Sequence, residues 1–114
     1  MMHSKSLWFL LLIVCNIVLP GCTGSKYVHF GCIGEAPHRI LRAKAGKLKP
    51  NSPWHCQQFC KGYTYFGVQY SHECFCGNNL HGQITPKQCT MPCAGNGLLR
   101  CGGSSIIDVY ISIN

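Results

Sequence analysis

The sequence contains very few acidic residues: Glu35, Glu73 and Asp108 are the only ones among its 114 residues. Catalysis of the glycosidase type needs two carboxyl groups held a few ångströms apart, and three scattered acids supply no recognisable pair. A Gly-x-Ser-x-Gly nucleophile motif is also absent. We therefore expect that the protein is not an enzyme.

Metal-binding patterns are missing as well. The closest cysteine spacings, Cys-x-x-x-Cys and Cys-x-Cys, are poor ones for zinc. The histidines beyond residue 25 lack the i,i+4 spacing of a zinc-binding helix; they are His29, His38, His55, His72 and His81. We expect neither a metal nor a cofactor.

Long hydrophobic runs are absent except near the N-terminus, where the apolar run Leu7–Leu19 follows Lys5. This run is too short to span a bilayer and fits the apolar region of a secretory signal. Small residues favour cleavage after Gly24 or one residue later. We expect residues 1–24 to be a signal peptide and residues 25–114 to be one secreted domain without a membrane span.

Cleavage after Gly24 removes Cys15 and Cys22 together. An alternative is that Leu19-Pro20-Gly21-Cys22 acts as a bacterial lipoprotein cleavage box, in which Cys22 would carry the lipid. Pro20 fits such a box poorly, so we favour the signal peptide.

What the rest of the chain has in abundance is cysteine. An even number of thiols in a short exported chain is typical of a disulfide framework. A domain of this size buries only about 60–65% of its unfolded surface, and each disulfide contributes about 2–4 kcal/mol to compensate. The eight cysteines are Cys32, Cys56, Cys60, Cys74, Cys76, Cys89, Cys93 and Cys101.

Local patterns predict an α+β fold with a small antiparallel sheet and one helix. Ser52 is a favourable N-cap, and Pro53 suits the first helical position. Aromatic and β-branched residues favour strands, whose ends are set by turn residues. The predicted elements are a helix over 53–61 and strands over 63–70, 73–76 and 106–111.

The cysteine spacings link the predicted helix to a strand. Cys56 and Cys60, four residues apart, share one face of the helix, and Cys74 and Cys76 point to the same side of a strand. The two spacings are about 6 Å and about 7 Å. Two parallel disulfides between these pairs would therefore join the helix to the sheet.

Several strings resemble a WSC domain in residue order and spacing. They are Tyr27–Cys32, Arg39–Leu41, Tyr63–Tyr70, Glu73–Asn78, Cys89–Asn96, Cys101–Gly103 and Asp108–Tyr110. The resemblance covers about residues 27 to 110. It implies a short helix on a five-stranded antiparallel sheet, similar to PAN/apple modules. It also implies the disulfides Cys32–Cys89, Cys56–Cys74, Cys60–Cys76 and Cys93–Cys101.

WSC domains are regarded as carbohydrate-binding and occur in fungal cell-wall sensors, fungal enzymes and animal receptors. We expect this chain to differ from those proteins in having no Ser/Thr-rich stalk, membrane span or catalytic domain. The resemblance thus implies a secreted, lectin-like protein that recognises cell-wall or extracellular-matrix polysaccharide. The alternative is a secreted protein-interaction factor, such as a venom, defence or matrix component, that uses the scaffold without binding glycan.

Sugar recognition needs flat aromatic faces flanked by amides and carboxylates. An equally simple interpretation is that the tyrosines pack in the core, that the tryptophan covers its edge and that the asparagines form a turn. The candidate ligand-binding residues are Tyr70, His72, Glu73, Trp54, Asn78 and Asn79. The first three rank highest, because a tight turn would expose them.

A run of basic residues lies between residues 39 and 49. Such a cluster attracts anionic partners, and a sulfated glycan is a candidate; the alternative is a solvated basic loop. Nucleic acid is not expected as a partner of a secreted, disulfide-bonded protein. The candidate residues for this anionic-partner patch are Arg39, Arg42, Lys44, Lys47 and Lys49.

Overall fold

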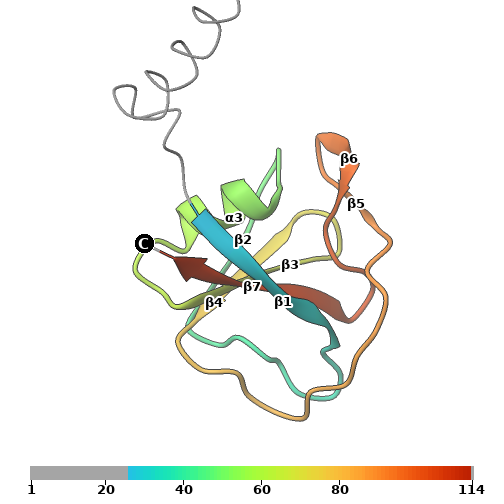
Figure 1. The fold of residues 1–114 in the computed structure, drawn as a ribbon. Coiled ribbons are helices and arrows are strands. Elements are labelled where there is room, and N and C mark those ends of the chain that lie inside the picture. The colour runs from blue at the N-terminus through green and yellow to red at the C-terminus, as the bar shows by residue number, and fades with distance from the viewer. Residues whose placement is uncertain (1–25, 114) are drawn as a thin grey trace, which may run out of the picture.

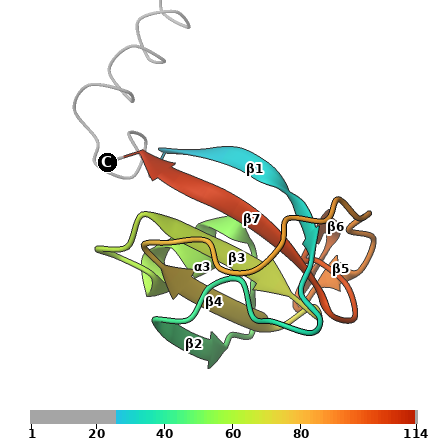
Figure 2. The same ribbon diagram turned by 90° about the horizontal axis from the view of Figure 1, so that it is seen from below.

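The computed structural model describes residues 26–113; the expected signal peptide, residues 1–24, with Cys15 and Cys22, lies outside the described part. Helix α3 spans Pro53–Phe59 (Figure 1). The strands are β1 Lys26–Gly34, β2 Lys44–Lys47, β3 Tyr65–Gln69, β4 Glu73–Gly77, β5 Pro92–Cys93, β6 Asn96–Arg100 and β7 Ile106–Ile113. Five of them form an antiparallel sheet in the order β1-β7-β3-β4-β2, which Figure 2 shows from top to bottom, and β5 and β6 form a separate hairpin. The expected fold class is confirmed.

Apolar clusters cover both faces of the sheet. On the helix face, α3 packs on β3 and β4, and the buried residues are Cys56, Cys60, Phe66, Val68, Cys74, Cys76, Cys93 and Cys101. On the opposite face, which we call the loop face, the loops around residues 40 and 80 pack on the sheet. Its buried residues are Ile33, Ile40, Leu41, Phe75, Ile107 and Val109. The sheet is therefore the middle layer of three.

Helix α3 begins where its capping signals predict. The Ser52 hydroxyl accepts a hydrogen bond of 3.0 Å from the backbone N–H of His55, and Pro53 occupies the first helical position. This cap satisfies one of the N–H groups that an α-helix leaves unpaired at its start. The helix ends at Phe59, two residues before the predicted end.

Four disulfides hold the layers together, and they are the four pairings that the family resemblance implies. Cys56–Cys74 and Cys60–Cys76 join the helix to β4. Cys32–Cys89 ties β1 to the long loop between β4 and β5, and Cys93–Cys101 closes the β5–β6 hairpin. Within residues 26–113 no cysteine is left free.

The predicted strands are present, with shifted ends: β3 begins at Tyr65 rather than residue 63, and β7 continues to Ile113. Strands β1 and β2 were not indicated by local patterns. Strand β2 lies inside the basic run, where a solvated loop was the alternative. It hydrogen-bonds to β4 as the edge strand of the sheet.

The two ends of the described chain lie side by side, because β1 and β7 pair antiparallel with Lys26 opposite Ile113. The turn between β3 and β4 lies at the other end of β7, where Gln69 pairs with Ile107. Among residues 26–113 there is no helix with the length and apolar character needed to cross a membrane.

Candidate functional site

The turn between β3 and β4 has an unusual backbone. Tyr70 and Ser71 have φ angles of 48° and 69°, in the left-handed region that residues other than glycine seldom adopt. Such conformations persist where the surrounding structure holds them, and they cluster at functional sites. The turn is therefore the first place to look for a binding surface.

Hydrogen bonds from three other segments hold this turn. The Ser71 N–H donates to the Cys101 carbonyl at 3.1 Å, and the Ser71 carbonyl accepts from the Ala94 N–H at 3.1 Å. The Leu48 N–H donates to the His72 carbonyl at 2.7 Å. The buried amide of Asn51 donates to the carbonyls of Ser71 at 3.2 Å and of Glu73 at 3.3 Å. These bonds fix the turn before any ligand arrives.

The fixed turn presents an aromatic pair to solvent. Tyr70 is 47% exposed, and its ring lies edge-on to that of His72, with the centroids 5.8 Å apart. Helix α3 begins beside the turn, because Asn51 directly precedes the N-cap. Trp54, in the first turn of that helix, is 48% exposed and packs edge-on against His55. Exposed aromatic rings from two elements thus occur at the same end of the domain.

Beside the turn, the loop face carries a hollow of about 270 Å³. Its floor is the Phe75 ring, and the Arg39 guanidinium lies over that ring, 4.2 Å from its centroid. The side chain of Glu73 shares this face with Phe75, two residues further along β4. The hollow is lined by Arg39, Ala45, Gly46, Lys47, Glu73 and Phe75.

A second hollow of about 250 Å³ also has Arg39 in its lining. It is lined by Glu35, Ala36, Pro37, Arg39, Gln69 and Ser105. Glu35 is buried; its carboxylate accepts hydrogen bonds from the Ile40 N–H at 3.0 Å and from Arg39 at 3.1 Å. Burial raises the pKa of Glu35 above its ordinary value, although the hydrogen bond from the Ile40 N–H, the charge of Arg39 and a hydrogen bond with the Gln69 side chain oppose this. The Gln69 side-chain oxygen is buried and has no hydrogen-bond partner.

The structure brings some predicted residues together and separates others. Tyr70, His72 and Glu73 lie on one turn. Asn78 and Asn79 follow the far end of β4, about 16 Å along the strand from Glu73 at ~3.3 Å per residue. The Asn78 side chain accepts a hydrogen bond of 2.9 Å from the Thr64 N–H, so it supports a loop at that end.

The five basic residues of the anionic-partner patch do not share one surface. The Lys44 ammonium donates to the Phe59 carbonyl and lies 4.1 Å from the Phe59 ring centroid, on the helix face. Arg39 and Lys47 line the hollow on the loop face. Arg42 donates to the Arg39 carbonyl, and Lys49 is exposed just before Pro50. The patch expected from sequence is thus divided between the two faces.

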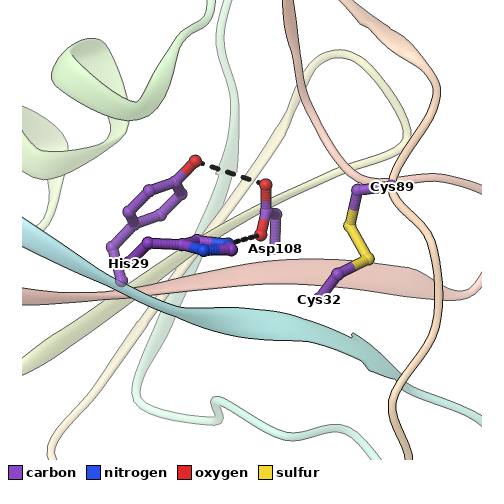
Figure 3. Close-up of polar contacts among 5 residues, drawn as sticks. His29, Cys32, Cys89 and Asp108 are labelled. Carbon is purple, nitrogen blue, oxygen red and sulfur yellow. Dashed lines mark hydrogen bonds and ion pairs between the residues drawn. A yellow bond between two sulfur atoms is a disulfide. The ribbon is translucent and has the colours of Figure 1, made fainter.

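A group of polar side chains links β1 to β7 on the helix face (Figure 3). The buried Asp108 carboxylate contacts the His29 ring nitrogen at 2.5 Å and accepts a hydrogen bond of 3.2 Å from the Tyr110 hydroxyl. Burial, together with the neighbouring Asp108 charge, raises the pKa of Tyr110. All three side chains come from the paired strands β1 and β7, so the group joins the edge strand β1 to the rest of the sheet.

Two groups of possible metal ligands occur in the described chain. One is Cys56, Cys60 and Cys74, and the other is Cys32, Cys89 and Asp108. Every sulfur in them is already bonded in a disulfide. Because the thiolate is the form of cysteine that binds metals, these sulfurs are not available as ligands.

Sequence reasoning did not single out Gln69. A signal for it existed, because the period-two alternation from Tyr65 places Gln69 on the loop face beside the predicted turn. Its partners in the hollow, Glu35 and Arg39, come from a distant loop. That proximity is a tertiary property with no local signature.

Comparison with known proteins identifies similar sequences. The model of the WSC domain family matches residues 29–103. A WSC domain-containing protein of Arthroderma benhamiae is 33% identical over 77% of this chain and 13% of its own length. A Chaetomium globosum protein, provisionally named a fungistatic metabolite, is 30% identical over 86% of this chain and 46% of its own length. A Drosophila melanogaster xylosyltransferase is 34% identical over 80% of this chain and 11% of its own length. The chain spans less than half of each relative.

Proposed function

Because this chain belongs to the WSC domain family, we propose that it is a secreted, non-enzymatic protein that binds polysaccharide. The proposed site is the turn Tyr70–Glu73 with the hollow beside it. Tyr70 would stack on the C–H face of a sugar ring, and His72 and Glu73 would hydrogen-bond to its hydroxyl groups.

One observation carries this proposal: an exposed tyrosine stands on a turn with left-handed backbone that several hydrogen bonds fix in place. The left-handed backbone of Tyr70 costs conformational energy. Core packing does not account for this cost, because the Tyr70 side chain is 47% exposed. A ring that is already fixed loses little entropy when a ligand binds. A fixed and exposed tyrosine ring suits a ligand with flat faces that makes weak individual contacts, such as a polysaccharide.

The oxidising environment that this fold requires supports the proposed location. The four disulfides join every layer of the described domain. Disulfides persist in extracellular and other oxidising compartments. A secreted protein meets cell-wall and matrix polysaccharide in such surroundings.

A second candidate function is protein binding through the β5–β6 hairpin. Leu98 and Leu99 on β6 are 93% and 40% exposed, and the Cys93–Cys101 disulfide closes the hairpin. Exposed apolar side chains on a rigid loop favour insertion into a hydrophobic pocket of a partner. A partner that is retained after deglycosylation and lost on Leu98→Ser would favour this function.

The glycan proposal is tested with disulfide-bonded protein from the full chain and a set of immobilised neutral and acidic polysaccharides. Tyr70→Ala should lower the affinity for the retained polysaccharide about tenfold, which corresponds to about 1.4 kcal/mol. Phe30→Ala is the matched control, because Phe30 is 41% exposed and lies on β1, away from the turn. Absence of retention on every polysaccharide at low salt would refute the proposal.

A further inference from the structure

We propose that the hollow between Arg39 and Lys47 is a subsite for an acidic sugar residue, a deduction that rests on the proposed glycan binding. The anionic group, a carboxylate or a sulfate, would lie between these two cations. The ring hydroxyls would donate to Glu73 and to Gln69. We call this set of residues, with Phe75 as its floor, the acidic-sugar groove.

The first argument is the state of Lys47. Lys47 on β2 and Glu73 on β4 are directly opposed cross-strand residues, a placement in which opposite charges usually pair. Nevertheless, no ion pair joins them within residues 26–113. The Lys47 ammonium is exposed at the rim of the hollow. It is therefore available to an external anion.

The second argument is that Arg39 is a fixed cation. One guanidinium nitrogen donates to the buried Glu35 at 3.1 Å, and the group lies over the Phe75 ring. Its side chain remains 49% exposed, and a guanidinium has five N–H donors in a rigid plane. It can therefore hold Glu35 and still present donors to a carboxylate or a sulfate.

The third argument is the unsatisfied oxygen of Gln69. Gln69 is 7% exposed, and its side-chain oxygen has no hydrogen-bond partner in the described structure. Leaving a buried acceptor unpaired is unfavourable, so a donor from a ligand would be welcome there. Gln69 lines the second hollow, which shares Arg39 with the hollow of Lys47, and it is the cross-strand partner of Glu73. A sugar hydroxyl is a donor of the right kind for both side chains.

Size and charge agree with this ligand. The two hollows, of about 270 and about 250 Å³, are each below the ~300–1,000 Å³ typical of sites for drug-sized molecules. Each therefore suits a single ring of a chain that continues into solvent. The formal net charge of the full sequence is +7, and only one of its cations, Lys5, lies in the expected signal peptide. The secreted domain is therefore still strongly positive, which steers acidic polymers towards it.

The test compares related polymers that differ in their acidic groups. Chondroitin sulfate, its desulfated form and its carboxyl-reduced form separate sulfate from carboxylate, and an uncharged β-glucan serves as the neutral ligand. Wild type should bind at least one of the acidic polymers about tenfold more tightly than the β-glucan. Retention of the desulfated form assigns the carboxylate, and retention of the carboxyl-reduced form assigns the sulfate; either result supports the proposal.

Lys47→Gln should lower the affinity for the acidic polymer about tenfold and flatten its salt dependence, with an unchanged melting temperature. Lys61→Gln, which removes an exposed charge outside the groove, should change neither. Arg39 is not used, since its loss would leave Glu35 buried without its cation.

Equal affinity of Lys47→Gln and wild type for the acidic polymer would overturn the acidic-sugar groove. Preference for the neutral polymer would overturn it as well. In both cases the proposed function stands if Tyr70→Ala still weakens binding, whereas a failure of every polymer to bind would remove both.

Discussion

Gly102 lies so close to the backbone of Val68 that a Cβ atom on Gly102 would stand 2.6 Å from the Val68 carbonyl oxygen. Its φ of +73° is also in the left-handed region, which favours glycine. The neighbouring Cys101 carbonyl accepts the hydrogen bond from Ser71. The close approach of Gly102 to β3 therefore helps to hold the candidate binding turn.

Gly102→Ala should lower the free energy of unfolding by at least about 3 kcal/mol, because the clash is with backbone atoms and the φ is unfavourable. Chemical denaturation with the disulfides intact measures this. Gly97→Ala is the control: a Cβ atom on Gly97 would meet nothing within 4 Å, so its effect should stay below about 1 kcal/mol. Equal effects of the two substitutions would contradict the packing argument.

Ser52→Ala should destabilise the protein by about 1 kcal/mol, because the helix loses the side-chain acceptor for the His55 N–H. Thermal unfolding followed by circular dichroism measures the change. Ser104→Ala, at an exposed turn position, should be close to neutral. A neutral Ser52→Ala would mean that the two disulfides to β4 hold the helix without the cap.

Asn51→Ala should lower the free energy of unfolding by about 1–3 kcal/mol, since a buried amide that donates to two carbonyls is lost. It should also weaken polysaccharide binding, because the turn that carries Tyr70 is no longer fixed. Asn79→Ala, at an exposed position after β4, should change neither property. Unchanged polysaccharide affinity in a destabilised Asn51→Ala protein would show that a fixed turn is not needed for binding.

Removing the two loop-closing disulfides should have unequal effects. Cys32 and Cys89 are 57 residues apart, and Cys93 and Cys101 are 8 apart. From chain entropy, the losses in unfolding free energy should be about 4 and about 2.5 kcal/mol. Urea denaturation of the two paired Cys→Ser proteins tests this. A larger loss for the short loop would indicate that native contacts around the hairpin outweigh chain entropy.

Stability should also depend on pH through Glu35. Burial raises its folded-state pKa above the ordinary 4.5, so the folded protein keeps this proton at pH values where the unfolded chain has lost it. The contribution is therefore fully present at low pH and is lost as pH rises through the folded pKa. Compared with Glu35→Gln, the wild-type unfolding free energy should fall over the pH interval that begins near the ordinary pKa of 4.5 and ends once Glu35 has ionised in the folded protein. A rise over that interval would mean that Arg39 outweighs burial.

The sequence predicted those helices and strands whose residues carry a strong local preference. The cap at Ser52, Pro53 and the aromatic β-branched run predicted α3 and β3 to within a few residues. Strand β2, Lys-Ala-Gly-Lys, has little intrinsic strand preference and becomes a strand because the edge of β4 offers it hydrogen bonds. Strand β1 depends in the same way on β7, which lies at the opposite end of the sequence.

The candidate site was predictable only where it is continuous in sequence. Tyr70, His72 and Glu73 were expected together and lie on one turn. The contributions of Arg39 and Gln69 depend on how the loop after β1 folds over the sheet, and no spacing rule connects the two. Trp54 remains a prediction supported by its exposure and by its position near the turn.

The antiparallel pairing of Lys26 with Ile113 has a consequence for how such a domain is joined to other proteins. Both ends of the described domain lie at the same end of the sheet. The domain can therefore be inserted into a surface loop of a larger protein without separating the two residues that flank the insertion. The turn with Tyr70 lies at the opposite end. A graft of this kind would carry the turn with Tyr70 outward, away from the point of attachment.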